Sequence, residues 1–262
     1  MKKLLILFFA GISLFTVAIA QKLPSIQENS LRAPSGIKID GKATEWNNQF
    51  QAYNKNTEIY YTISNDSKNL YLAIQATDRD IANKIICSGL TFMINGSGKM
   101  KDQDGMSITF PALKRDRRGG VGTTTDRLSS KPPIEYYKDA AIMNVQLNSL
   151  LKDIKVAGTT KIPDTISIYN PEGIKAAAMF DDEKIFTVEM AIPRKYLQLT
   201  NNGKSLVYSI KIDGALLRNL TRRGVTSMKE INGVMIMEGP DVPRIQVLMA
   251  PTDFSGEYTL AK

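Results

Sequence analysis

The sequence predicts an all-β protein, built as a single antiparallel β-sandwich of the jelly-roll or immunoglobulin-like kind. The first observation is a succession of short runs rich in β-branched and aromatic residues, which begins at Glu58 and continues to the end of the chain. The second is that polar turns join these runs at the close spacing typical of sandwiches and barrels. The third is that one stretch alone has helical periodicity, which argues against alternating βαβ units.

The amino terminus is predicted to be a signal peptide, residues 1–20. A basic start precedes an apolar run that ends near Ile19, and Ala18-Ile19-Ala20 matches a signal-peptidase cleavage site. An uncleaved anchor is the alternative, but the run is short for a membrane span. Gln21 follows the cut where a bacterial lipoprotein would carry cysteine, and no later segment is apolar for long enough to cross a bilayer. We therefore expect a secreted or periplasmic protein with no transmembrane segment after cleavage.

The mature chain is expected to hold an N-terminal arm, residues 21–35, and one β-sandwich domain, residues 36–262. The arm has few large apolar residues and contains Pro24 and Pro34. The domain is long enough to bury a sizeable core. Cys87 is the only cysteine of the chain, so packing and not an internal disulfide must hold the fold together. We expect Cys87 to be buried and inert.

The strands are expected in pairs joined by polar turns. Glu58–Ile63 and Asn69–Ala76 form the clearest hairpin, because Asn65-Asp66-Ser67-Lys68 supplies a turn between them. The other expected strands are Ile85–Ile94, Met106–Phe110, Ile174–Phe180, Lys184–Ile192, Ser205–Asp213 and Glu257–Ala261.

One short helix is expected, over about residues 139–153. Apolar residues recur there at intervals of three and four, and Asp139 is placed to cap the first turn. Before it, residues 111–138 form a long basic connection rich in Gly, Thr and Pro. So long an irregular connection in a compact domain indicates either a functional use or local disorder.

The pentapeptide Ile-Lys-Ile-Asp-Gly occurs twice, at residues 37–41 and 210–214. In each copy the isoleucines stand at i and i+2, so they face one side of a strand, and Asp-Gly suits the turn that ends it. No repeat lies between the copies. They are therefore interpreted as two similar strand ends and not as a duplicated domain.

The motifs IDGKATEW, DSKNLYLAIQATD and IFTVEMAIPRKYL, which span residues 39–197, resemble in their order the family 9 carbohydrate-binding modules and their DOMON-like relatives. The resemblance implies a β-sandwich and a glycan ligand. It also implies that Trp46 packs the first turn onto the sandwich, in agreement with the usual burial of large aromatics. Because Trp46 is the only tryptophan, the family's clamp of two tryptophans around a sugar cannot form.

Composition excludes several chemistries. The chain has no histidine, which removes Ser-His and Cys-His nucleophiles, histidine-bound zinc and histidine-ligated haem. The formal net charge of +8 arises from scattered basic residues, and an exported chain is a poor candidate for binding nucleic acid.

Carboxylates remain as acid–base groups or calcium ligands. Asp78 and Asp80, after a strand, are the candidate calcium site, with a charged turn as the alternative; no other cofactor is expected.

The candidate ligand-binding residues lie in the long connection, where guanidinium groups that grip anions precede two tyrosines that stack on sugars: Arg115, Arg117, Arg118, Tyr136 and Tyr137. The preferred interpretation is a non-catalytic carbohydrate-binding-like module for an acidic or neutral glycan, such as a cell-envelope polysaccharide. The alternative is a structural or protein-interaction sandwich that has lost the sugar site, with an unknown protein partner. The third is a polysaccharide-acting enzyme that uses carboxylates.

Overall fold

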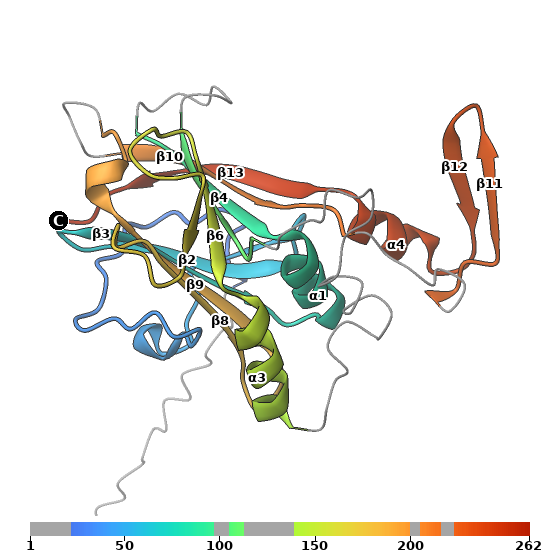
Figure 1. Cartoon of the computed structure of the whole chain (residues 1–262), viewed down its shortest axis with the longest axis horizontal. Coiled ribbons are helices and arrows are strands. Elements are labelled where there is room, and N and C mark those ends of the chain that lie inside the picture. Colours follow the sequence, from blue (N-terminus) through green and yellow to red (C-terminus); the bar gives the residue numbers. More distant parts are fainter. Residues whose placement is uncertain (1–21, 97–104, 113–138, 200–204, 216–222) are drawn as a thin grey trace, which may run out of the picture.

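The computed structural model describes residues 22–96, 105–112, 139–199, 205–215 and 223–262, and it confirms the predicted antiparallel β-sandwich (Figure 1). The first sheet has the strand order β1-β2-β3-β9-β8, with bounds Ala52–Asn54, Ile59–Asn65, Asn69–Ala76, Phe186–Pro193 and Lys175–Phe180. The second has the order β13-β10-β4-β5-β6-β7, with bounds Thr252–Thr259, Ser205–Ile212, Leu90–Asn95, Met106–Phe110, Asp153–Ala157 and Thr165–Ser167.

The main core lies between the two sheets. Tyr61 of the first sheet packs against Phe254 of the second, with ring centroids 4.9 Å apart. Its hydroxyl lies 2.9 Å from the hydroxyl of Tyr208, so the core contains a satisfied polar pair. Burial raises the pKa of Tyr61, although the hydrogen bond to Tyr208 opposes that shift. The sheets are thus joined by aromatic packing.

The N-terminal arm is tied to the sandwich. Gln27 donates from Nε2 to the carbonyl of Ile63 (2.8 Å), and its Oε1 accepts from the amide of the same residue (2.7 Å). Arg32 forms an isolated parallel bridge with Asn65. From Gln27 to Arg32 the N-terminal segment therefore follows strand β2.

The outer face of the first sheet carries a second, smaller core. Trp46, at the end of the 3-10 turn η1 (Thr44–Trp46), is 6% exposed and packs there with other apolar side chains: Ala43, Phe50, Tyr71, Ala73 and Ala191. Its indole Nε1 donates to Ser64 Oγ at 3.3 Å. The prediction that Trp46 packs in a core is confirmed.

The first Ile-Lys-Ile-Asp-Gly copy is a correction, because residues 37–41 form no strand. The amides of Asp40 and Gly41 donate instead to Glu189 Oε2 on β9, at 3.1 and 2.9 Å. Gly41 has φ +86°, and a Cβ there would lie 2.7 Å from the backbone carbon of Ala178, so only glycine fits. The second copy ends β10 as predicted, because its isoleucines pair within the second sheet.

The observed helices differ from the predicted ones in two places. The helix α3 (Ala140–Leu150) is confirmed, with Asp139 Oδ1 accepting from the amide of Ala141 (2.8 Å), but residues 153–157 form strand β6. The expected strand Ile85–Ile94 is wrong in its first half, since α1 (Arg79–Ser88) occupies it and β4 begins only at Leu90. Asp78 caps α1, and Gly89, with φ +89°, ends it.

The other expected strands are present: Asn69–Ala76 and Met106–Phe110 have the predicted bounds, and the rest have shifted ends. The last one starts at Thr252, five residues earlier than expected, and stops at Thr259. Sequence analysis missed β1 and β7, the helix α4 (Val242–Met249) and a separate hairpin of β11 (Ser227–Ile231) and β12 (Val234–Glu238). Most of the predicted long connection, residues 113–138, lies outside the described residues.

Candidate functional site

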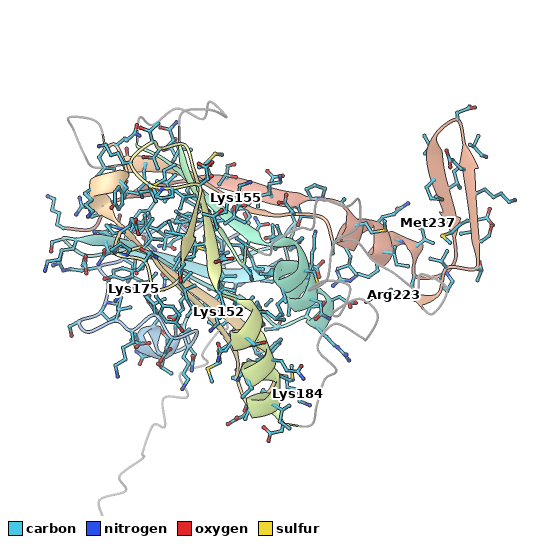
Figure 2. The ribbon with its side chains drawn as sticks, in the orientation of Figure 1. Lys152, Lys155, Lys175, Lys184, Arg223 and Met237 are labelled. Carbon is cyan, nitrogen blue, oxygen red and sulfur yellow. The ribbon has the colours of Figure 1, made fainter. Side chains whose placement is uncertain are left out.

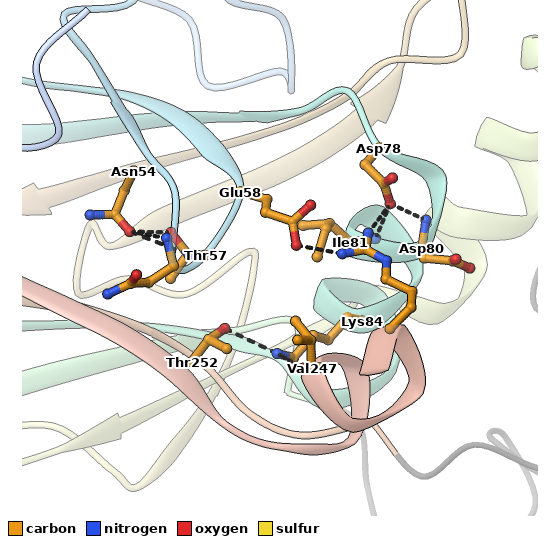
Figure 3. Close-up of polar contacts among 11 residues, drawn as sticks. Asn54, Thr57, Glu58, Asp78, Asp80, Ile81, Lys84, Val247 and Thr252 are labelled. Atoms are coloured by element: carbon orange, nitrogen blue, oxygen red, sulfur yellow. Dashed lines mark hydrogen bonds and ion pairs between the residues drawn. The ribbon is translucent and has the colours of Figure 1, made fainter. Parts of the chain in front are cut away.

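A charged cluster joins helix α1 to helix α4 (Figure 3). Asp78 Oδ1 accepts from the amides of Asp80 (2.8 Å) and Ile81 (3.0 Å), which caps α1. Arg244 of α4 reaches the same carboxylate, with Nη2 at 2.7 Å, and its Nη1 contacts Glu58 Oε1. Arg244 therefore joins α4 both to the start of α1 and to the turn before β2.

The cluster is partly exposed, which limits its strength. Burial alone would lower the pKa of Arg244, but the hydrogen bond to Glu58 and the charge of Asp78 raise it overall. Glu58 itself has φ +55°, a left-handed conformation that costs energy in a residue other than glycine. The hydrogen bond from Arg244 holds the Glu58 side chain in place at this turn.

Lys84 makes a second connection between the two helices. Its side chain is 1% exposed, and Nζ donates to the carbonyl of Val247 (2.9 Å) and to Thr252 Oγ1 (3.0 Å). Val247 lies in the last turn of α4, where a positive charge is favourable to the helix dipole. Burial lowers the pKa of Lys84 to about 8, although the charge of Glu58 opposes that shift. Helix α4 is therefore held near both ends.

A small apolar cluster joins α4 to the base of the hairpin. Val225, Val242 and Ile245 are buried together, with Met237 and Met249 packed against them. Met237 lies at the base of the hairpin, near α4 (Figure 2). The two chain segments at the base approach closely, because a Cβ on Gly239 would lie 2.0 Å from the carbonyl oxygen of Gly224. We call α4, this cluster and the charged contacts of Arg244 and Lys84 the pedestal.

The hairpin of β11 and β12, which we call the arm, extends from the pedestal away from both sheets (Figure 1). Its turn is Asn232-Gly233, with φ values of +53° and +80°. Positive φ at both central residues is the requirement of a type I′ turn, which matches the twist of the flanking strands. The arm is thus a regular hairpin on a well-packed base.

The arm exposes apolar side chains on both of its faces. It carries five of the nine large hydrophobic side chains that are exposed in the described part of the chain: Met228, Ile231, Val234, Met235 and Ile236. Their exposed fractions run from 42% to 61%. An isolated two-stranded hairpin is only marginally stable in water, and a contiguous exposed apolar surface is typical of an interaction site. The arm is therefore the candidate functional surface.

The residues predicted from sequence to bind ligand fall elsewhere. Arg115, Arg117, Arg118, Tyr136 and Tyr137 lie outside the described residues. Asp78 and Asp80 do lie close together, but Asp78 is held by Arg244 and Asp80 by Arg223, whose Nη1 is 3.5 Å from Asp80 Oδ1. Among the described residues no three acidic or thiol groups converge as a metal site would require. Asp78 is therefore part of the pedestal, and Asp80 is paired with Arg223.

Two further surface features could meet a polar ligand. A shallow hollow of about 510 Å³ is lined by Gly158, Thr159, Thr160, Lys161 and Gln198. On another part of the surface, Tyr169 is 78% exposed, with the ammonium of Lys152 5.7 Å from its ring centroid. Aromatic rings exposed in this way can stack on sugars, and hydroxyl and amide groups can bind sugar hydroxyls.

Comparison with known proteins adds no identification: no protein-family model matches the chain, and no curated protein matches it. Within the described ranges, no helix combines the length and the apolar character that crossing a membrane demands. Sequence reasoning missed the arm, although Asn232-Gly233 followed by the apolar run Val234–Met237 is a hairpin signal.

Proposed function

We propose that this chain is an exported, non-catalytic β-sandwich that binds another protein through the arm. The observation that carries the proposal is the exposed apolar surface of β11 and β12 on a base that is fixed by packing and by charge. Because the base of the arm is packed, the direction in which the arm leaves the sandwich is fixed before binding, which reduces the conformational entropy lost when a partner binds.

The charged residues of the arm also favour a protein partner over a membrane surface. Lys229 is its single basic residue, whereas Glu230 and Glu238 are acidic. Segments that bind anionic lipid combine apolar residues with several lysines or arginines. The arm therefore lacks the electrostatic attraction that such a membrane requires.

The proposal of export rests on the sequence, and the proposal of a non-catalytic role rests on the contacts of the two aspartates. The signal peptide proposed for residues 1–20 carries the export. Asp78 and Asp80, the carboxylates singled out from the sequence, each form an ion pair with an arginine, so both are engaged in structural contacts. This supports a binding module over an enzyme.

Photo-crosslinking in the cells that produce the chain tests the proposal. A benzophenone side chain at position 235 should give covalent adducts with a protein, because Met235 on β12 is 57% exposed. The matched control is position 155, where Lys155 is exposed on β6 of the sandwich. Equal adduct yields at the two positions would contradict a binding role for the arm.

Glycan binding is the second candidate function. It is supported by the exposed ring of Tyr169, by the polar hollow at residues 158–161, and by the resemblance to family 9 carbohydrate-binding modules. A glycan array probed with the mature chain should then show binding that Tyr169→Ala or Lys161→Ala weakens. An array without signal across neutral and acidic sugars would leave protein binding as the function.

A further inference from the structure

The edges of the sandwich are protected against pairing with other strands. Strands β1 and β7, at two of the four edges, have three residues each. Strand β8 lies against α3, where Asn144 exchanges hydrogen bonds with the backbone of Phe180. Strand β13 carries the charged residues Asp253 and Glu257. Short, covered or charged edges are the usual means by which proteins prevent edge-to-edge association.

The two edges of the arm differ in this respect. The strand β11 has Lys229 and Glu230 at its centre, whereas β12 has the unbroken apolar run from Val234 to Met237. When a strand pairs antiparallel with its own copy about a two-fold axis, the residue on the axis faces itself. On β11 an axis at Lys229 or Glu230 would place like charges opposite each other, which is unfavourable. An axis at Ile236 of β12 places two isoleucines opposite each other.

We propose that two copies of this chain associate through β12, which pairs antiparallel with β12 of the second copy about a two-fold axis at Ile236. The inference rests on the proposed function and names the partner. It joins the two arms into one four-stranded sheet in which the two β12 strands are central. Met235 of each copy then lies opposite Met237 of the other, and Val234 lies opposite Glu238.

This register agrees with the faces of the arm. Within one arm, Glu230 pairs with Met235 and Met228 with Met237, so these four side chains share a face, and Ile231, Val234 and Ile236 share the other. The proposed axis keeps each face continuous across the two copies. No like charges stand opposite each other at the new edge. The free backbone groups of β12 become paired, and a sheet of four strands is stable where two are marginal.

Sedimentation velocity on the purified mature chain measures the association. We expect a monomer–dimer equilibrium, and we expect Ile236→Lys to raise the dimer dissociation constant at least about tenfold, because two ammonium groups then face each other at the axis. Ile231→Lys makes the same chemical change on the same face of the arm, but on β11 and away from the axis. It should change the dissociation constant by less than about threefold.

A disulfide tests the register directly, in a Cys87→Ser background. Residues directly opposite each other in an antiparallel pair have Cα atoms about 4.5–5.5 Å apart, which is within the span of a disulfide. Ile236→Cys should therefore give a covalent dimer that reductant cleaves, and Ile231→Cys should give monomer. An unchanged thermal midpoint confirms that each variant is folded.

The outcomes separate this inference from the proposed function. A chain that stays monomeric, a dimer that survives Ile236→Lys, or a disulfide that forms at position 231 in preference to 236 would each overturn pairing through β12. If position 235 still crosslinks to a different protein, the arm remains a binding surface and only the identity of the partner was wrong. A chain that neither dimerises nor crosslinks through the arm overturns both.

Discussion

The Trp46 cluster and the arm both place apolar side chains outside the main core, and they differ in what covers them. On the outer face of the first sheet, the segment from Asp40 to Phe50 covers Tyr71, Ala73 and Ala191, and Trp46 is 6% exposed. On the arm, Met235 is 57% exposed and no described part of the chain lies over it.

The two apolar surfaces differ in whether the chain's own backbone covers them. The chain closes the first surface with its own backbone: the amides of Asp40 and Gly41 bind Glu189, and the indole binds Ser64. Among the described residues, the arm meets the rest of the chain at its base, where Met237 packs against the pedestal. Apolar groups under a cover stabilise the fold, whereas the exposed ones are available to a partner.

The largest expected effect concerns the covered surface. Trp46→Ala should lower the free energy of unfolding by about 3–5 kcal/mol, the usual cost of deleting a large buried aromatic side chain. Urea denaturation followed by circular dichroism measures it. A loss below about 1 kcal/mol would mean that the Trp46 cluster does not stabilise the fold, and the contrast with the arm would fail.

The second prediction concerns pH. Burial raises the pKa of Glu189 to about 8, against an ordinary value of 4.5, while hydrogen bonds from Gly41 and Asp40 oppose the shift. The folded chain therefore holds this proton more tightly than the unfolded chain. Its contribution to stability is complete below about pH 4.5 and is lost as pH rises through about 8, at a slope of up to about 1.4 kcal/mol per pH unit.

Glu189→Gln isolates that contribution, because the amide oxygen still accepts from the backbone and the side chain does not ionise. The unfolding free energy of the parent relative to this variant should fall between pH 5 and pH 8. Asp66→Asn is a useful comparison, since the pKa of Asp66 is lowered: burial raises it, but hydrogen bonds from Asn69 and Lys68 outweigh burial. A difference between parent and Glu189→Gln that is constant with pH would contradict the assignment.

A smaller effect is expected at the pedestal. Arg244→Gln removes both ion pairs, but the side chains involved are 29% to 45% exposed, so we expect a loss of no more than about 1 kcal/mol. The loss should be local. Hydrogen exchange should accelerate in α4 and at the base of the arm and stay unchanged in β3, and Lys155→Gln on β6 serves as the control. Uniform acceleration through the sandwich would show that Arg244 stabilises the whole fold.

The smallest effect is expected on the arm. Met235→Ser should change the free energy of unfolding of the dilute monomer by less than about 0.5 kcal/mol, because its side chain is mostly exposed before and after the change. Urea denaturation at low protein concentration measures it. A loss comparable to that of Trp46→Ala would place Met235 in a core and remove the difference between the two regions.

The sequence predicted the strands that are rich in β-branched and aromatic residues and joined by a polar turn, such as β2 and β3, and it predicted the capped helix α3. It misassigned α1, because the apolar run at residues 85–90 is too short for periodicity to separate strand from helix. The cap at Asp78 and the helical spacing of Ile81 and Ile85 would have corrected it. The error at α1 was therefore avoidable, because the local sequence contains the signals of a helix.

Other features could not be read from local patterns. Glu189 binds the amides of Asp40 and Gly41, which lie 149 and 148 residues away in the chain, and only the folded sheet brings them together. The same holds for Arg244, which is 186 residues from Glu58. The hairpin of the arm could have been predicted, since Asn232-Gly233 marks its turn. Its position away from the sandwich could not, because that depends on the tertiary fold.

Methionine oxidation by hydrogen peroxide compares the two regions most directly in the unmodified chain. Exposed methionines oxidise first, so in the dilute purified protein Met228 and Met235 should form sulfoxides while Met190, 1% exposed in the core, should not. In the cells that produce the chain, or at a concentration where it associates, Met235 should become protected, because it lies on β12 beside the contact with the partner. Equal oxidation of Met235 in all three conditions would contradict the claim that the arm is a binding surface.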